Sequence, residues 1–98
     1  MQISYLKDKG KDIFKNFGVK KAYVFGSLSR GEFKDGSDVD LLVYFEKTPS
    51  LIKYVQFIES LEDSFNVKFD VLTEKSLPAR LKPYIKNDLK AIYEYEER

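Results

Sequence analysis

The sequence predicts an α/β or α+β sandwich formed by a single domain, residues 1–98. Three segments place apolar residues at helical spacing, and three short runs rich in β-branched and aromatic residues lie between them. The expected order is α-β-α-β-α-β-α, with no internal repeat or low-complexity linker. A length of 98 residues suits one domain and leaves no room for a separate substrate domain.

The first helix is expected from Ile3 to Phe17, where apolar residues recur at helical spacing and Gly18 is placed to end it. The aromatic and β-branched segment "KKAYVF", residues 20–25, predicts a short strand that ends at Gly26. The segment "SLSRGEF" that follows is compatible with a single helical turn, and "KDGS", residues 34–37, with a reverse turn.

The clearest strand is "DVDLLVYF", residues 38–45, whose continuous apolar half is typical of a central strand covered on both faces. Thr48 is expected to cap the next helix, with Pro49 at its first position. The expected buried stripe of this helix, flanked by Ile52 and Phe57, comprises Leu51, Tyr54, Val55, Ile58, Leu61 and Phe65.

The third strand is expected in "VKFDVL", residues 67–72, where Val67, Phe69 and Val71 would face one side and Asp70 the other. From about Ser76 the chain is predicted to be helical, with Pro83 as a kink or break. The apolar stripe of this last helix would comprise Leu81, Ile85, Leu89 and Ile92.

Composition excludes several classes of function. A net charge of +1 argues against binding nucleic acid directly through a large basic face. The chain has no Cys and no His, which excludes disulfides, thiol nucleophiles and most zinc sites. A metal would therefore be held by oxygen ligands, as Mg²⁺, Mn²⁺ and Ca²⁺ are. Neither a signal peptide nor a segment approaching the roughly 20 apolar residues of a membrane span is visible, so no membrane association and a cytoplasmic location are expected.

Aromatic residues make up 15% of the chain and allow two interpretations. Phe57, Tyr84, Tyr93 and Tyr95 can form part of a partner surface, because Tyr and Phe are enriched in interface cores. Alternatively they fill the small core, which has few other large side chains.

Asp38 and Asp40 are expected to face the same side of their strand, about 6.6 Å apart at a rise of about 3.3 Å per residue. Asp70, on the next strand, can join them from the adjacent position in the sheet. Two like charges on one face repel, so the arrangement favours a divalent cation between or before them. Three carboxylates suit two Mg²⁺ ions that also bind a nucleoside triphosphate. Taken singly, the aspartates have a structural interpretation instead: Asp38 closes a turn, Asp40 is a solvated strand-edge residue and Asp70 is exposed.

The turn "GSLSRG" lies at the end of the first strand and has features of a phosphate site. Gly26 lets the backbone approach a phosphate closely, Ser27 supplies a hydroxyl, and Arg30 can pair with phosphate oxygens as a fork. The alternative is a plain glycine turn with a surface arginine.

Three rival motifs fail on inspection of the residues. The two glycines of "GSLSRGEF" have Walker A spacing, but Glu32 and Phe33 replace its Lys and Ser/Thr. An EF-hand loop starting at Asp35 would place Val39 at a ligand position and Asp40 at the obligatory glycine. A serine hydrolase has no histidine base available.

The stretch "VFGSLSRGEFKDGSDVDLLV", followed by "FDVL", closely resembles the minimal nucleotidyltransferases of the DNA polymerase beta superfamily. Their pattern is Gly-Ser, a nearby Arg-Gly, Ser-Asp-x-Asp on a strand and a third Asp on a later strand. The resemblance covers about residues 24–72 and implies a mixed β-sheet flanked by helices, with ATP and Mg²⁺ as cofactors.

The resemblance also implies roles for single residues. Gly26, Ser27 and Arg30 would bind the triphosphate, whereas Asp38 and Asp40 would bind both metal ions. Asp70 would complete the catalytic metal site and help to deprotonate the acceptor. Gly31 and Ser37 match the pattern but are interpreted as turn residues.

Minimal members of this family are typically paired with a small helical HEPN-domain toxin, and they resemble antitoxins that transfer AMP to a tyrosine of that ribonuclease. The resemblance therefore implies an antitoxin with a HEPN-type partner, in a homodimer or a hetero-oligomer. Two alternatives stay open: a non-catalytic nucleotide-binding module that neutralises a toxin by contact, and transfer of a nucleotide to a small molecule.

Overall fold

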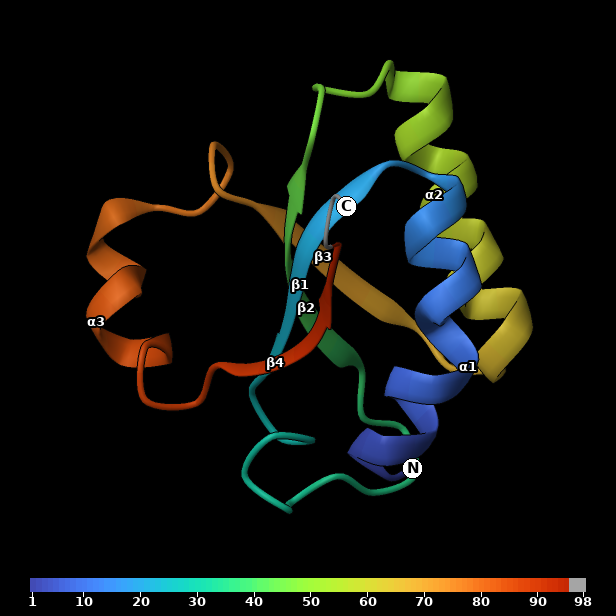
Figure 1. Ribbon diagram of the computed structural model, residues 1–98. Helices are drawn as coiled ribbons and strands as arrows, with labels where there is room; N and C mark the ends of the chain where they lie inside the picture. Colours follow the sequence, from blue (N-terminus) through green and yellow to red (C-terminus); the bar gives the residue numbers. More distant parts are fainter. Residues whose placement is uncertain (96–98) are drawn as a thin grey trace.

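The computed structural model describes residues 1–95, which form one four-stranded sheet and its covering helices (Figure 1). Along the chain the elements are α1 (Ile3–Asn16), β1 (Val19–Phe25), β2 (Val39–Phe45), α2 (Leu51–Phe65), β3 (Phe69–Thr73), the 3-10 turn η1 (Ala79–Leu81), α3 (Lys82–Ile85) and β4 (Lys90–Glu94). The strand order is β3-β2-β1-β4, with β1 antiparallel to both neighbours and β2 parallel to β3. The predicted α+β architecture with a mixed sheet is confirmed.

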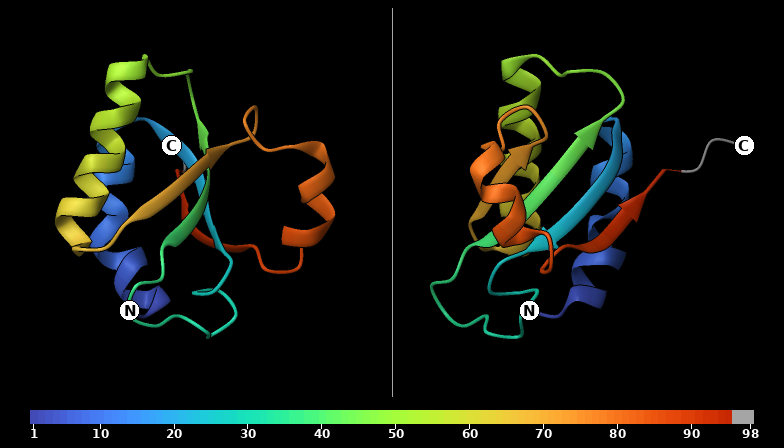
Figure 2. Two further views of the ribbon diagram at one scale, coloured as in Figure 1. Left: turned by 180° about the vertical axis from the view of Figure 1, so that it is seen from behind. Right: turned by 90° about the vertical axis from the view of Figure 1, so that its left-hand side faces the viewer.

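The two long helices lie together on one face of the sheet, and the segment with η1 and α3 lies on the other (Figures 1 and 2). The central strand β2 is therefore covered on both sides, as its continuous apolar run predicts. A small second cluster, Phe25, Leu42 and Leu77, is buried under the α3 segment. The α3 segment thus forms a thin second layer over the carboxyl end of β1, on the face of the sheet opposite α1 and α2.

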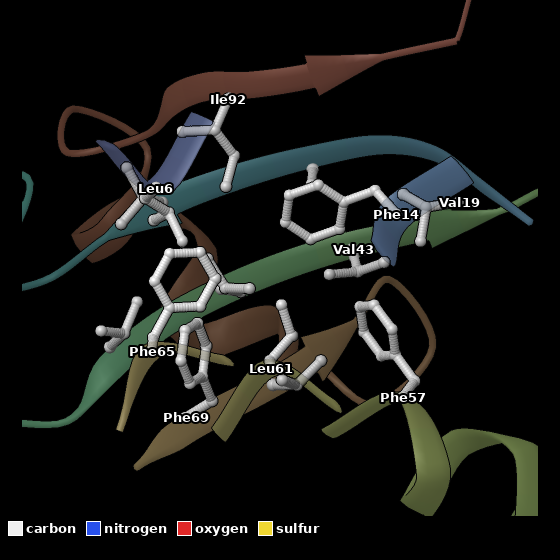
Figure 3. Packing of buried hydrophobic residues seen from close by; sticks show 14 of the residues in the cluster. Leu6, Phe14, Val19, Val43, Phe57, Leu61, Phe65, Phe69 and Ile92 are labelled. Atoms are coloured by element: carbon white, nitrogen blue, oxygen red, sulfur yellow. The ribbon is translucent and has the colours of Figure 1, made fainter. Parts of the chain in front are cut away.

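The main core lies between the sheet and the two long helices (Figure 3). Residues four apart give each helix its buried face: Leu6, Gly10 and Phe14 on α1, and Phe57, Leu61 and Phe65 on α2. The rings of Phe14 and Phe57 meet at a centroid distance of 6.1 Å. Full burial of such a side chain contributes about 2–3 kcal/mol to folding, so these contacts fix the helices on the sheet.

The expected start and buried face of α2 need correction. Ser50, not Thr48, is the N-cap: its hydroxyl accepts a hydrogen bond from the Lys53 backbone N–H at 3.2 Å. Pro49 precedes the cap. Leu51 and Val55 are exposed, whereas Phe57, placed at the flank of the stripe, is fully buried. The helix is rotated toward Phe57 because that ring packs against α1.

The expected C-terminal helix is wrong beyond its first turns. Between residues 76 and 95 only η1 and the four residues of α3 are helical, and residues 90–94 form β4, which pairs with β1. Ile92 consequently enters the core from a strand. Pro83 is compatible with the first turn of α3, but no long helix follows. Pairing with β4 satisfies backbone N–H and C=O groups of β1 that would have lacked a partner if residues 90–94 were helical.

Smaller expectations have mixed outcomes. The segment "SLSRGEF" forms the expected single turn, in which the Arg30 N–H donates to the Gly26 carbonyl at 3.1 Å. Asp38 precedes β2, and β3 begins at Phe69 rather than Val67. Within residues 1–95 no helix is long and apolar enough to cross a membrane.

Of the four aromatic residues with two interpretations, Phe57 is buried in the core and Tyr93 packs on Phe14, with 5.4 Å between their ring centroids. Tyr84 and Tyr95 are instead exposed, at 79% and 41%. The core interpretation is correct for the first pair only.

Candidate functional site

The pairing of β1, β2 and β3 brings the predicted carboxylates and the Gly-Ser turn together at one end of these strands. Because β1 and β2 are antiparallel, Phe25 at the end of β1 pairs with Asp40 at the start of β2. On the other side, Asp40 pairs in parallel register with Asp70 of β3. Asp40 therefore lies inside the sheet, which excludes a solvated strand-edge role for it.

Gly26 is fitted tightly against Asp40. Its φ of +75° lies in the left-handed region, and a Cβ built on it would lie 2.2 Å from Asp40 Oδ2. A side chain at this position would displace the carboxylate. The turn after β1 and the Asp40 side chain are thus in direct contact, as a compact phosphate and cation site requires.

The pKa of Asp40 is raised from its ordinary value of 3.8 to about 6. Burial is the largest cause, and the negative charges of Asp70 and Asp38 add to it, whereas Arg30 opposes it. The ionised carboxylate is therefore costly in the protein alone. A cation beside Asp40 would remove that cost.

A cavity of about 540 Å³ lies at this end of the strands. Five of the six predicted site residues line it: Gly26, Ser27, Arg30, Asp38 and Asp40. Asp70 does not line it, although it neighbours Asp40 in the sheet. Within the described residues, 1–95, no group of three or more acidic side chains is arranged to hold a metal ion by itself.

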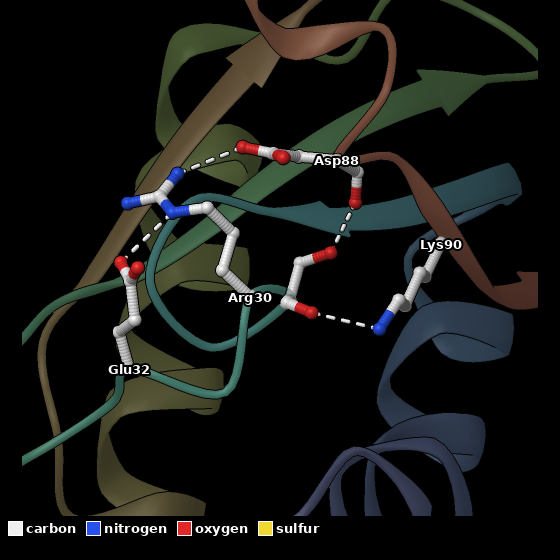
Figure 4. A network of polar contacts seen from close by, with 5 residues as sticks. Arg30, Glu32, Asp88 and Lys90 are labelled. Atoms are coloured by element: carbon white, nitrogen blue, oxygen red, sulfur yellow. Dashed lines mark hydrogen bonds and ion pairs between the residues drawn. The ribbon is translucent and has the colours of Figure 1, made fainter.

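Arg30 lies on the cavity wall but is engaged by two carboxylates (Figure 4). Its Nε donates to Glu32 Oε2 at 2.9 Å and its Nη1 to Asp88 Oδ2 at 2.8 Å. These hydrogen bonds, that with Glu32 first, raise the pKa of Arg30, so the guanidinium is a permanent positive charge at the site.

Tyr84 and Asp88 also line the cavity, and the sequence analysis did not identify them as site residues. Both belong to the segment that was expected to be one long helix. Their only sequence signal is an aromatic and a carboxylate side chain within "PYIKNDLK", and this carries no information on which strand end the segment meets. The fold alone places them there.

Comparison with known proteins identifies the family. Residues 4–93 match the family described as "Nucleotidyltransferase domain". The chain belongs to this family. The match spans all the predicted site residues.

Three known proteins illustrate the similarity. Protein adenylyltransferase MntA of Thermococcus cleftensis is 43% identical over 74 residues, which is 76% of this chain and 75% of that protein. A complex of tri-AMPylated Shewanella oneidensis HEPN toxin with MNT antitoxin contains a chain with TM-score 0.72 and 17% identity, covering 96% of this chain and 74% of its own. A toxin–antitoxin structure with AMP-PNP gives a TM-score of 0.77 at 20% identity, covering 92% and 74%. The last two likenesses establish the fold.

Proposed function

We propose that this protein is an adenylyltransferase that transfers AMP from ATP to a tyrosine hydroxyl of a HEPN-domain toxin and thereby acts as its antitoxin. The observation that carries the proposal is the 43% identity to a protein adenylyltransferase over three quarters of both chains. The toxin in one similar complex is AMPylated, and another similar structure holds the ATP analogue AMP-PNP. Both support the choice of donor and acceptor.

The residues at the cavity fit a divalent cation of the Mg²⁺ type. All candidate ligands are carboxylate oxygens, and the cavity is lined by three carboxylates, from Asp38, Asp40 and Asp88, against the single guanidinium of Arg30. The pKa of Asp40 is raised chiefly by burial and secondly by the negative charges of Asp70 and Asp38, so a cation would stabilise its ionised form. Asp38 and Asp40 would hold the metal, with Asp70 completing the site. When bound, Mg²⁺ supplies charge neutralisation at the phosphates and activation of the attacking oxygen.

The chain's own residues then bind and orient the reactants. Gly26 and Ser27 hold the triphosphate against the turn, and Arg30 pairs with its oxygens. The acceptor oxygen forms a bond to the α-phosphorus while the bond to the departing pyrophosphate breaks. Asp70, which neighbours Asp40 in the sheet, would take up the hydroxyl proton.

The test is intact-mass spectrometry of a co-expressed HEPN-domain protein, incubated with the chain, ATP and Mg²⁺. The expected result is a mass increase of one or more AMP units. The Asp38→Asn, Asp40→Asn double variant should abolish it, and the matched Asp12→Asn, Asp63→Asn variant, with both changes on exposed helix positions, should not. Omission of Mg²⁺ should also abolish the transfer.

Two outcomes would contradict the proposal. Transfer by the Asp38, Asp40 double variant would overturn the assigned metal ligands. A stable complex without any mass increase would instead favour the non-catalytic binding module, which neutralises the toxin by contact. Native mass spectrometry of the same mixture gives the composition of the complex, for which we propose a hetero-oligomer.

A further inference from the structure

Two segments that are far apart in the chain are joined at the wall of the cavity (Figure 4). Besides the ion pair between Arg30 and Asp88, the Ser29 hydroxyl donates to the Asp88 carbonyl, and Lys90 Nζ donates to the Ser29 carbonyl at 2.7 Å. Ser29 is only 5% exposed. The turn after β1 and the connection between α3 and β4 therefore form one hydrogen-bonded unit.

The two carboxylate partners of Arg30 are not equivalent. The Asp88 side chain is 21% exposed, whereas that of Glu32 is 61% exposed. Although the hydrogen bond with Glu32 does more to raise the pKa of Arg30, water screens an exposed ion pair, so the less exposed Asp88 constrains the position of Arg30 more than Glu32 does. Asp88 also lines the cavity with Arg30, and Glu32 does not.

Donor counting shows what the anchored guanidinium can still do. Of its five N–H groups, one on Nε and one on Nη1 are used by Glu32 and Asp88. Within residues 1–95 the other three have no acceptor. A guanidinium held along one side can present its remaining N–H groups to a polyphosphate without first losing the mobility of a free side chain.

We propose that Asp88 is a positioning residue, which holds Arg30 at the cavity wall so that its remaining N–H groups meet the phosphates of the nucleotide. The proposal rests on the proposed function, because it assumes a nucleoside triphosphate in this cavity. The contact with Arg30 also lets a carboxylate stand beside an anionic ligand, because the guanidinium, which it shares with Glu32, offsets part of the negative charge of Asp88.

The test measures the Kd of a nonhydrolysable ATP analogue in the presence of Mg²⁺ by calorimetry, for Asp88→Asn, Arg30→Ala and the double variant. Asp88→Asn removes the side-chain charge but keeps the backbone carbonyl that accepts from the Ser29 hydroxyl. We expect Kd to rise about tenfold in Arg30→Ala and about fivefold in Asp88→Asn, typical of a lost charge-assisted hydrogen bond and a lost anchor. The double variant should match Arg30→Ala, since Asp88 acts only through Arg30.

Glu32→Gln is the matched control, because it removes the other carboxylate partner of the same guanidinium. We expect its Kd to change by less than about threefold, as for an exposed ion pair. Arg30→Lys gives a second variant that does not alter Asp88. A lysine keeps the charge but loses the fork, so Kd should again rise about fivefold.

Unchanged nucleotide binding by Asp88→Asn or by Arg30→Lys would overturn the inference. So would a double variant that binds more weakly than Arg30→Ala, because Asp88 would then act independently of Arg30. If either result came with normal AMP transfer by the wild type, the proposed function would stand. If the wild type binds the analogue as predicted but transfers no AMP, the proposed function fails and the inference stands. If the wild type does not bind the analogue, both fail.

Discussion

Replacing Asp40 with Asn should make the metal-free protein more stable at neutral and alkaline pH, although it removes a proposed metal ligand. Asn has nearly the same shape as Asp and carries no charge. The pKa of Asp40 rises from 3.8 in its ordinary state to about 6 in the fold, chiefly through burial and secondly through Asp70. The native state therefore binds this proton more tightly than the unfolded chain, and ionisation of Asp40 destabilises the fold.

The size of the effect follows from the same values. At about 1.4 kcal/mol per pKa unit the difference corresponds to about 3 kcal/mol. Because Asp40 is only half-buried and screened by water, we reduce this to about 1 kcal/mol. The stability contributed by protonated Asp40 is fully present below pH ~4 and is lost as the pH rises through about 6. Asp40→Asn should thus match the wild type at low pH and unfold about 4–8 °C higher at pH 8.

The assay is thermal and urea unfolding from pH 4 to 8 in EDTA, with Asp63→Asn on the exposed face of α2 as the matched control. Adding Mg²⁺ should narrow the difference in stability between Asp40→Asn and the wild type, because only the wild type keeps the Asp40 carboxylate proposed to bind the ion. A difference that does not vary with pH, or a variant that is less stable at pH 8, would refute the electrostatic reasoning.

Two pairs of variants, each a test and its control, probe local features of the fold by urea unfolding. Gly26→Ala should cost about 2–4 kcal/mol, because it combines a left-handed backbone with a Cβ 2.2 Å from the Asp40 carboxylate. Gly36→Ala, at φ +87° with nothing within 4 Å of the new Cβ, should cost only about 1–2 kcal/mol, and equal costs would contradict the contact. Ser50→Ala should cost about 1 kcal/mol through loss of the α2 cap. Thr48→Ala should cost almost nothing, and the reverse order would place the cap at Thr48.

Much of the candidate site could be predicted from local pattern. Asp38 directly precedes β2 and Asp40 is the second residue of this strand, whereas Gly26 and Ser27 directly follow β1. The structure brings these four residues to one cavity together with Arg30. Asp88 could not be predicted, because its contact with Arg30 joins positions 58 residues apart and depends on β4 pairing with β1.

The sequence by itself determined the two long helices, the first three strands and the carboxylates at the start of β2, because each follows from a period of apolar residues over a short range. Only the tertiary structure decided the C-terminal segment, where β4 replaces the expected helix. The spacing of Ile85, Leu89 and Ile92 suits a helix, yet β1 needed a second hydrogen-bonding neighbour, and pairing with residues 90–94 satisfied its backbone. Local periodicity shows which face of a segment is apolar. It does not show which other segment will pair with its backbone, because that depends on the element that lies beside it in the fold.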